Sequence, residues 1–208
     1  MAMWRCGLIA LVLLVNGNMR VAVSPLVLAE TAHAQENGID LIAFWKIIED
    51  ARSGASDDED FLSRIKSRLQ MLKPAELQGF ERHLGNLHAE SHSWRLWGAA
   101  YLMNGGCSDD CFDYFRAWLM SQGRKTFEDA LKDPDTLAHV GGSKIRTREL
   151  EQFMYLAQEA YEEKTGQEMP DSVYQGVTRP ELGERWDFDD DTEMKKRYPE
   201  LFAKYRRR

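Results

Sequence analysis

The sequence predicts an all-α fold, a compact multi-helix bundle of short helices in orthogonal and antiparallel pairs, with an irregular C-terminal segment. Three observations predict it. Apolar residues recur at three- and four-residue spacing through most of the chain. Glycine and proline separate these runs by short loops, which favour antiparallel neighbours. No run of alternating polar and apolar residues is long enough to propose a sheet. With 208 residues, of which 43% are hydrophobic, the chain can bury the core of one domain.

The first 34 residues differ from the rest and are expected to be a signal peptide, which leaves a periplasmic or secreted protein. Arg5 gives a positive charge ahead of an apolar stretch over residues 6–15, and residues 32–34 read AHA, the small-x-small spacing that signal peptidase accepts. The apolar stretch is too short to span a bilayer, so no membrane span is expected in the mature chain. The alternative is a cytoplasmic protein that starts at Met19.

Three amphipathic helices are expected next. The first begins at Asp40 and ends at the Ser-Gly pair of residues 53–54. Ser56 and Glu59 have the spacing of a capping box and begin the second helix. The third helix starts at Pro74, because proline suits the first helical position, where its missing amide hydrogen costs nothing.

The following helix, over residues 94–102, is apolar on most faces and is expected to be the central, buried one. The glycines at 105–106 end it, since glycine adopts the left-handed conformation without a steric penalty. Ser108 then caps another helix, and the aspartate that follows it, Asp109, lies where the helix dipole favours negative charge. Gly123 ends that helix.

Helix signals become shorter toward the C-terminus. A short helix ends at the Asp-Pro pair of residues 133–134, and a longer one carries an apolar stripe over residues 150–161. These elements complete a core helical domain expected over residues 40–166. Residues 167–208 are expected to form the irregular segment, packed on the core and ending in two short helices split by Pro199.

Four motifs carry a resemblance to a known family. Residues 96–101 read LWGAAY, residues 105–110 read GGCSDD, residues 112–119 read FDYFRAWL and residues 180–186 read PELGERW. Together they resemble the bacterial family catalogued as domain of unknown function 4240, over nearly all of the mature chain. The resemblance implies a mostly helical, usually cytoplasmic domain with no established activity. Cys111 replaces the family's usual small residue, and most members lack an export segment, so this chain is expected to be a periplasmic variant.

The turn around Cys107 is the most distinctive feature and is expected to be the centre of a surface that binds an unknown small ligand or protein partner. Its glycines, cysteine, carboxylates and nearby arginines exceed what helix capping requires. Capping is the alternative explanation: Ser108 satisfies helix amides, and Asp113 pairs with Arg116 or Arg124. The candidate binding residues are Cys107, Ser108, Asp109, Asp110, Asp113, Arg116 and Arg124.

The alternative function is a metal-assisted hydrolase, in which Asp109, Asp110 and Asp113 converge to hold a hard cation or supply a general base. Cys107 and Cys111 form a candidate disulfide in an oxidising compartment, or else two small buried thiols. A stress-response protein acting through these cysteines is a third hypothesis. Their spacing exceeds that of Cys-x-x-Cys, which disfavours dithiol catalysis. Whether the protein is an enzyme stays open, and no cofactor is assigned.

Two other clusters suggest metal ligands but are better explained by structure, so no metal site is predicted. His88 and His92 have helical spacing, with His83 as a distant third zinc candidate, but this spacing often arises by chance. Residues 187–191 alternate like a calcium loop but lack its glycine and its terminal glutamate. We expect these aspartates to form a solvated loop that caps the final helix.

Aromatic residues and net charge limit the remaining possibilities. Trp45, Trp97 and Trp118 are expected in the core rather than in a ligand platform. Trp186 is expected to pin the irregular segment to the domain. The net charge of −7 argues against a nucleic-acid groove and against an anionic membrane surface as partners.

Overall fold

The chain divides into two units, which are described separately: residues 1–37 and residues 38–208. In the first unit, β1 (Val12–Val15) pairs antiparallel with β2 (Asn18–Val21). No sheet was expected from the sequence, although an Asn-Gly pair between short apolar runs is a strong hairpin signal. The rest of the expected signal peptide, including its cleavage site at residues 32–34, lies outside the described residues. The computed structural model describes residues 12–15, 18–21, 38–141 and 148–206.

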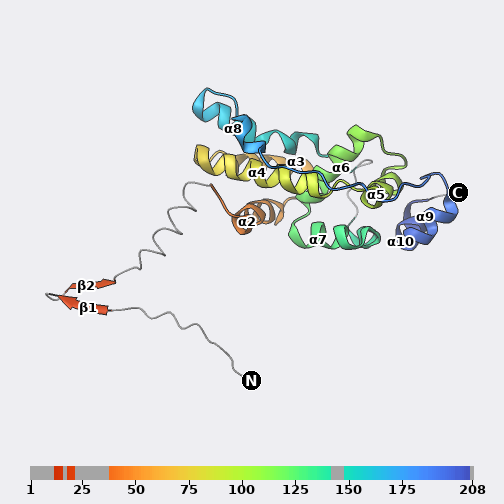
Figure 1. Ribbon diagram of the computed structural model, residues 1–208, viewed down its shortest axis with the longest axis horizontal. Coiled ribbons are helices and arrows are strands. Elements are labelled where there is room, and N and C mark those ends of the chain that lie inside the picture. Colours follow the sequence, from red (N-terminus) through yellow and green to blue (C-terminus); the bar gives the residue numbers. More distant parts are fainter. Residues whose placement is uncertain (1–11, 16–17, 22–37, 142–147, 207–208) are drawn as a thin grey trace, which may run out of the picture. The chain divides into compact units, whose positions relative to one another are not determined.

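The second unit confirms the predicted all-α bundle of short helices (Figure 1). In Figure 1, α4 runs through the middle of this unit, with α8 and α9 toward opposite ends. No helix among the described residues is long and apolar enough to cross a membrane. The α-helices are α2 (Leu41–Arg52), α3 (Asp58–Leu69), α4 (Pro74–Glu90), α5 (Trp94–Asn104), α6 (Asp109–Ser121), α7 (Arg124–Lys132), α8 (Leu156–Thr165), α9 (Asp191–Arg197) and α10 (Pro199–Tyr205). Three 3₁₀ helices are η1 (Pro134–His139), η2 (Glu151–Met154) and η3 (Asp171–Tyr174).

Side-chain caps set where the first helices begin. Asp40, where the first helix was predicted to begin, caps α2. The capping box predicted for α3 is displaced by one residue: Asp57 accepts a hydrogen bond from the Asp60 amide at 2.9 Å, and Asp60 accepts one from the Ser56 amide at 3.0 Å. Asp57 is therefore the N-cap in place of Ser56, and the Asp60 carboxylate reaches the amide before the N-cap rather than that of the N-cap itself.

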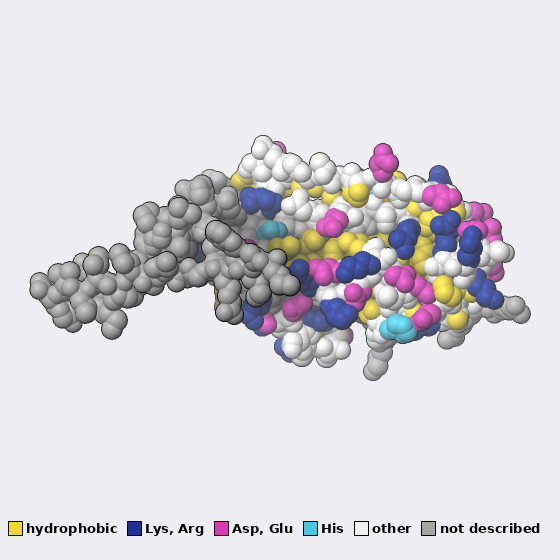
Figure 2. All heavy atoms as spheres, turned by 60° about the horizontal axis from the view of Figure 1, so that its bottom comes forward, with side chains coloured by type: hydrophobic (Ala, Val, Ile, Leu, Met, Phe, Trp, Pro, Cys, Tyr) yellow, Lys and Arg dark blue, Asp and Glu magenta, His cyan; other side chains and the backbone are white. Residues whose placement is uncertain are grey.

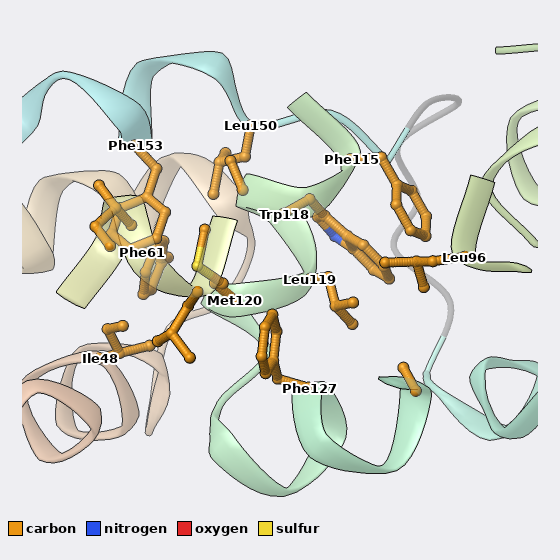
Figure 3. Packing of buried hydrophobic residues seen from close by; sticks show 14 of the residues in the cluster. Ile48, Phe61, Leu96, Phe115, Trp118, Leu119, Met120, Phe127, Leu150 and Phe153 are labelled. Carbon is orange, nitrogen blue, oxygen red and sulfur yellow. The ribbon is translucent and has the colours of Figure 1, made fainter. Parts of the chain in front are cut away.

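The hydrophobic core is built around α6 (Figure 3). Phe115, Trp118 and Leu119 on this helix are buried, and Trp118 is among the largest side chains in the core. Trp45 on α2 is also buried, so the prediction of a core position is confirmed for Trp45 and Trp118. On the face drawn in Figure 2, acidic and basic side chains are intermixed around a band of hydrophobic ones.

The helix predicted over residues 150–161 is broken into η2 and α8, with Tyr155 between them. A 3₁₀ turn places residues three apart on one face, so Leu150 and Phe153 both reach the core. Phe153 packs edge-on against Phe61, with ring centroids 5.5 Å apart. Tertiary packing therefore overrides the helical pattern here.

The C-terminal helices are part of the core. Met194 of α9 and Tyr198 and Leu201 of the α10 region are buried in it. Asp190, in the acidic loop, caps α9, the first of the last two helices, whereas the loop was expected to cap the final helix. The Asp135 carboxylate, from η1, accepts hydrogen bonds from the Leu201 amide at 2.8 Å and from the preceding amide at 3.0 Å. It thereby satisfies the free amides at the start of α10, where negative charge is also favoured.

Candidate functional site

Glycine, serine and a disulfide shape the turn between α5 and α6. Gly105 ends α5 in the left-handed conformation, with φ of 72°, which side chains other than glycine rarely adopt. Ser108 begins α6, because its hydroxyl accepts a hydrogen bond from the Cys111 amide at 3.2 Å. A disulfide joins Cys107 to Cys111, whose Cα atoms are 5.2 Å apart. The end of α5, the cap of α6 and the disulfide therefore fix the conformation of the turn.

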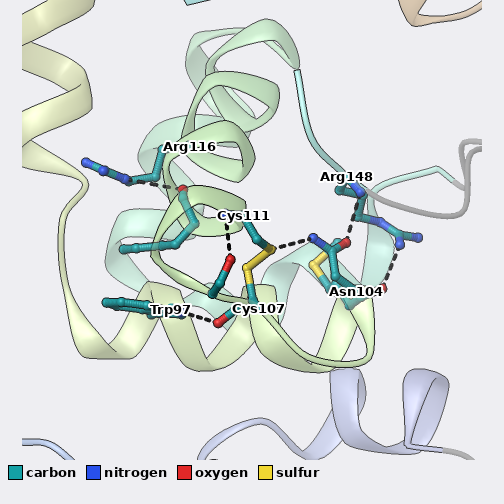
Figure 4. Close-up of a disulfide and its surroundings, with 9 residues drawn as sticks. Trp97, Asn104, Cys107, Cys111, Arg116 and Arg148 are labelled. Atoms are coloured by element: carbon teal, nitrogen blue, oxygen red, sulfur yellow. Dashed lines mark hydrogen bonds between the residues drawn. A yellow bond between two sulfur atoms is a disulfide. The ribbon is translucent and has the colours of Figure 1, made fainter. Parts of the chain in front are cut away.

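Asn104 and Arg148 connect this turn to the C-terminal helix (Figure 4). The Asn104 side-chain amide donates to Cys111 Sγ at 3.4 Å, and its oxygen accepts from the Arg148 amide at 2.9 Å. The Arg148 guanidinium donates to the Met103 carbonyl at 2.9 Å and to the Tyr205 hydroxyl at 3.0 Å. These polar groups beside the disulfide are thus engaged within the fold.

Arg116, a candidate binding residue, is 1% exposed. Its guanidinium donates to the Asp113 carboxylate and to the His88 carbonyl, and lies 4.9 Å from the centroid of the Phe112 ring. Burial lowers the pKa of Arg116, while the Asp113 carboxylate raises it. The pairing with Asp113 that the sequence offered as an alternative is therefore present, and it occupies Arg116 within the protein.

The three carboxylates do not converge. Asp109 and Asp110 are exposed, whereas Asp113 is 45% exposed and faces Arg116. None of them lines the three pockets described below. The arrangement expected for a metal-assisted hydrolase is therefore not formed by these side chains.

Arg124 does not share a surface with Cys107. It begins α7, where its Nε donates to Glu128 Oε1 at 2.6 Å. The 13 residues of α6 separate it from the disulfide turn, and a helix of this length spans about 20 Å. The single binding surface expected from Cys107 to Arg124 is thus corrected: its members lie at opposite ends of one helix, and Arg116 is buried between them.

The histidines contact other parts of the protein. His88 Nε2 lies 3.2 Å from a carbonyl oxygen of α6, and burial, aided by Arg116, lowers the pKa of His88 to about 4. His83 Nε2 lies 3.0 Å from a backbone carbonyl, and the His92 ring lies beside the rings of Trp97 and Phe112, at centroid distances of 6.4 and 5.8 Å. Across the described part of the chain, no three histidine, cysteine or acidic side chains are placed to hold a metal ion.

An open pocket of about 540 Å³ lies beside α5, where residues from the irregular segment cover that helix. Four of its seven lining residues are aromatic, and the other three are charged. We call it the aromatic pocket, and it is lined by Trp94, Tyr101, Arg185, Trp186, Asp187, Phe188 and Asp189.

Residues 182–189, which we call the C-terminal strap, are fixed to α5 at both ends. The Trp94 amide donates to the Leu182 carbonyl at 3.0 Å. The Tyr101 hydroxyl donates to Asp189 Oδ1 at 2.7 Å, and this hydrogen bond raises the pKa of Tyr101. The pocket is thus bounded by a helix and by a segment about 90 residues later in the sequence, held by hydrogen bonds.

Gly98 allows the strap to lie close to α5. A Cβ atom at this position would be 2.5 Å from the Tyr198 hydroxyl and 3.0 Å from the Trp186 ring, so any other residue would push both aromatic side chains away. Tyr198 donates its hydroxyl hydrogen to the Arg95 carbonyl at 2.6 Å. The Trp186 indole donates to the Met194 sulfur at 3.3 Å. Trp186 therefore packs the strap onto the domain, as expected from the sequence.

Trp97 connects the disulfide turn to the aromatic pocket. Its indole N–H donates to the Cys107 carbonyl at 3.0 Å. Its ring stacks between Trp94, at a centroid distance of 5.0 Å, and Phe112, at 4.8 Å. The turn does not line the pocket, but it holds the ring against which the pocket residue Trp94 rests. Trp97, which was expected in the core, is half-buried. Its ring supports the pocket residue Trp94.

Two further pockets can be compared with the aromatic pocket. One of about 600 Å³ lies beside α3 and α8, and its side chains include Lys66 and Glu159, which form an ion pair at 3.3 Å. The other, of about 320 Å³, lies beside α7 and η1. Neither of these two is lined by tryptophan, tyrosine or phenylalanine, whereas the aromatic pocket combines large apolar surfaces with convergent polar groups.

Glu81 on α4 is a buried carboxylate, 3% exposed. Its Oε1 accepts hydrogen bonds from the Gln158 amide at 2.9 Å and the Tyr174 hydroxyl at 2.8 Å. Its Oε2 has no hydrogen-bond partner among the described residues. Burial raises the pKa of Glu81, because water no longer solvates its charged form.

No ligand pocket was predicted at the residues of the aromatic pocket, although a signal for one was present in the sequence. Residues 185–189 read RWDFD, with two large aromatic residues in a segment that has no helical pattern to bury them. Exposed aromatic residues of this kind often mark a binding site. Their partners Trp94 and Tyr101 are distant in sequence, and only the fold brings the two groups together.

A family model described as a protein of unknown function, DUF4240, matches residues 40–163. The match covers α2 to most of α8 and ends before the strap. No curated protein and no solved structure matches the chain.

Proposed function

We propose that this chain, which belongs to the DUF4240 family of proteins of unknown function, is an exported domain that binds a small ligand in the aromatic pocket. The observation that carries the proposal is the lining of this pocket: four aromatic side chains together with one guanidinium and two carboxylates, around a volume of about 540 Å³. Small-molecule sites are typically concave and apolar, with a few polar groups that orient the ligand.

The pocket is organised before any ligand arrives. Hydrogen bonds at 3.0 Å and 2.7 Å hold the two ends of the strap on α5. Trp94 is supported from behind by Trp97, which the Cys107 carbonyl holds in place. Preorganisation of this kind favours binding, because less side-chain entropy is lost when the ligand enters. It also gives the distinctive turn a part in the function without direct ligand contact.

Binding is favoured over hydrolysis because of where the carboxylates lie. A general base or a metal site requires carboxylates that converge on one position. Asp109 and Asp110 are exposed on α6, and Asp113 is engaged by Arg116. The aromatic pocket has two carboxylates of its own, and one of them, Asp189, already accepts the Tyr101 hydroxyl.

Export is the second part of the proposal, and the disulfide supports it. Disulfides persist in oxidising compartments and are rare in the cytosol, and the turn carries one between Cys107 and Cys111. The apolar stretch and the AHA triplet over residues 32–34 supply the export signal. We expect the full chain, expressed in a Gram-negative host, to be recovered from the periplasm. Its intact mass should be that of a chain whose first residue is Gln35. Recovery of a cytoplasmic chain that begins at Met1 or Met19 would contradict export.

A screen of small molecules by thermal shift tests the ligand-binding proposal. We expect compounds that raise the melting temperature of the wild-type protein to lose this effect in Trp94→Ala, which removes one wall of the pocket. A ligand at 100 times its Kd stabilises a protein by about 2.7 kcal/mol, which is easily measured. Lys66→Ala is the matched control, because Lys66 lines the other large pocket. If the compounds stabilise Trp94→Ala as they do the wild type, but fail with Lys66→Ala, the proposed site is wrong.

A further inference from the structure

We infer that the aromatic pocket recognises a small quaternary ammonium cation. The inference rests on the proposed function and names the ligand class for the same site. Three features of the pocket lead to it: the angles between its rings, the arginines that already lie over them, and the charges of its lining residues.

The aromatic rings form walls rather than a flat platform. Phe188 lies at their centre, and its ring makes interplanar angles of 65° with Trp94, 71° with Trp186 and 50° with Tyr101. Its centroid is 5.4 to 6.0 Å from each of the other three. Flat ligands such as sugar rings stack best on coplanar surfaces. Inclined ring faces suit a compact, rounded group, such as a methylated ammonium, which can contact several faces at once.

The rings already attract cations from the protein itself. The Arg185 guanidinium lies 5.0 Å from the centroid of the Trp94 ring, and the Arg197 guanidinium lies 4.0 Å from that of Trp186. Both distances are within the range of a cation–π interaction, in which the negative face of the ring attracts positive charge. Arg197 is also paired with Glu184 and Glu193 on its outer side. Arg185 belongs to the pocket lining and is exposed, so a ligand cation can compete with it for the Trp94 face.

The charges of the lining residues favour a cation as well. Asp187 and Asp189 outnumber the one cation in the lining, Arg185. Arg206 lies closer to Asp191, at 2.8 Å, than to Asp189, at 3.9 Å. Arg206 is therefore paired mainly with Asp191, and Asp189 is one of two carboxylates that line the pocket. A carboxylate beside an aromatic wall supplies the long-range attraction that the rings alone lack.

A pair of ligands with the same shape but different charge tests the inference. Choline carries a trimethylammonium group, and 3,3-dimethylbutan-1-ol carries a neutral tert-butyl group in its place. The Kd of each is measured by tryptophan fluorescence titration and calorimetry on the wild-type protein. We expect choline to bind about 5- to 30-fold more tightly than the neutral alcohol, the ratio that a cation–π contribution of the usual size produces.

Three variants test the residues that carry the inference. Phe188→Leu keeps an apolar side chain but removes a ring, so it is expected to weaken choline binding and to change binding of the neutral alcohol much less. Asp187→Asn keeps the oxygen that accepts a hydrogen bond from the Asp189 amide at 2.9 Å but removes a charge, and is expected to weaken choline binding several-fold.

Arg185→Gln removes the competing cation and is expected to tighten choline binding. A gain of affinity cannot come from misfolding. Glu168→Gln, which removes the same charge at an exposed position outside the pocket and the strap, is the matched control and is expected to leave both Kd values unchanged.

The possible outcomes test the ligand class and the location of the site separately. Tighter binding of choline than of the alcohol, with a gain in Arg185→Gln, supports the inference. Equal binding of the two ligands overturns the cation class, although the pocket then still binds a small apolar ligand. If neither ligand binds while the screen finds compounds that need Trp94, the class is overturned and the proposed function stands. If neither binds and the screen finds no compound dependent on Trp94, both are overturned.

Discussion

Arg116→Ala is expected to lower the free energy of unfolding by about 2–4 kcal/mol, because it truncates a large buried side chain and leaves a hydrogen-bond acceptor without its donor. Arg116 is 1% exposed and donates to the Asp113 carboxylate and to the His88 carbonyl. Its loss would leave the His88 carbonyl without this donor and a cavity beside the Phe112 ring. Urea or thermal unfolding, followed by circular dichroism, measures the effect.

Arg124→Ala is the matched control, because both arginines were candidate binding residues and both pair with a carboxylate. The Arg124 ion pair with Glu128 is nearly half-exposed on both sides, and exposed pairs contribute about 0.2–1 kcal/mol. We expect this variant to unfold within about 1 kcal/mol of the wild type. A cost for Arg116→Ala that is no larger than that for Arg124→Ala would show that Arg116 does not stabilise the core as described.

Glu81→Gln is expected to raise the free energy of unfolding at pH 8 by about 1–2 kcal/mol. The charged Glu81 carboxylate is buried with one oxygen unpaired, and a buried group without a hydrogen-bond partner costs about 1–3 kcal/mol, more when it is charged. Glutamine keeps an oxygen for the Gln158 and Tyr174 donors and removes the charge. Chemical denaturation at fixed pH measures the difference.

The gain from Glu81→Gln should depend on pH in a defined direction. Burial raises the pKa of Glu81 above its ordinary value of 4.5, so the folded protein binds this proton more tightly than the unfolded chain does. The corresponding stability of the wild type is fully present below pH 4.5 and is lost as the pH rises through the pKa of the folded state. The advantage of Glu81→Gln should therefore shrink between pH 8 and pH 4. Glu90→Gln, at an exposed position on the same helix, is the control, and an advantage that does not change with pH would count against a buried charge.

The helices could be predicted from the sequence because their signals are local. Asp40, Pro74, Ser108 and Gly105 begin or end helices by interactions within a few residues. The break at Tyr155 could not be predicted, because it follows from Phe153 reaching the distant Phe61 ring. Local patterns report the helix period, but not the tertiary contact that interrupts it.

The candidate site was only partly predictable, for a similar reason. The turn around Cys107 was identified from its unusual composition, and its structure is indeed distinctive. Arg116 was placed on a binding surface although it lies four residues after Phe112, on the core face of the same helix, and this spacing was the available sign of burial. The pocket itself required Tyr101 and Asp189 to meet across 88 residues, which no local pattern reveals.

The central claim, that the aromatic pocket is the ligand site, is tested most directly by NMR of the tryptophan indole groups. The spectrum is recorded with and without a compound that stabilises the wild-type protein in the thermal-shift screen, and the signals are assigned by single Trp→Phe variants. We expect the indole signals of Trp94 and Trp186 to move with ligand concentration, while those of Trp45 and Trp118, buried in the core, stay in place. Movement confined to other residues, with the Trp94 and Trp186 signals unchanged at saturation, would contradict the claim.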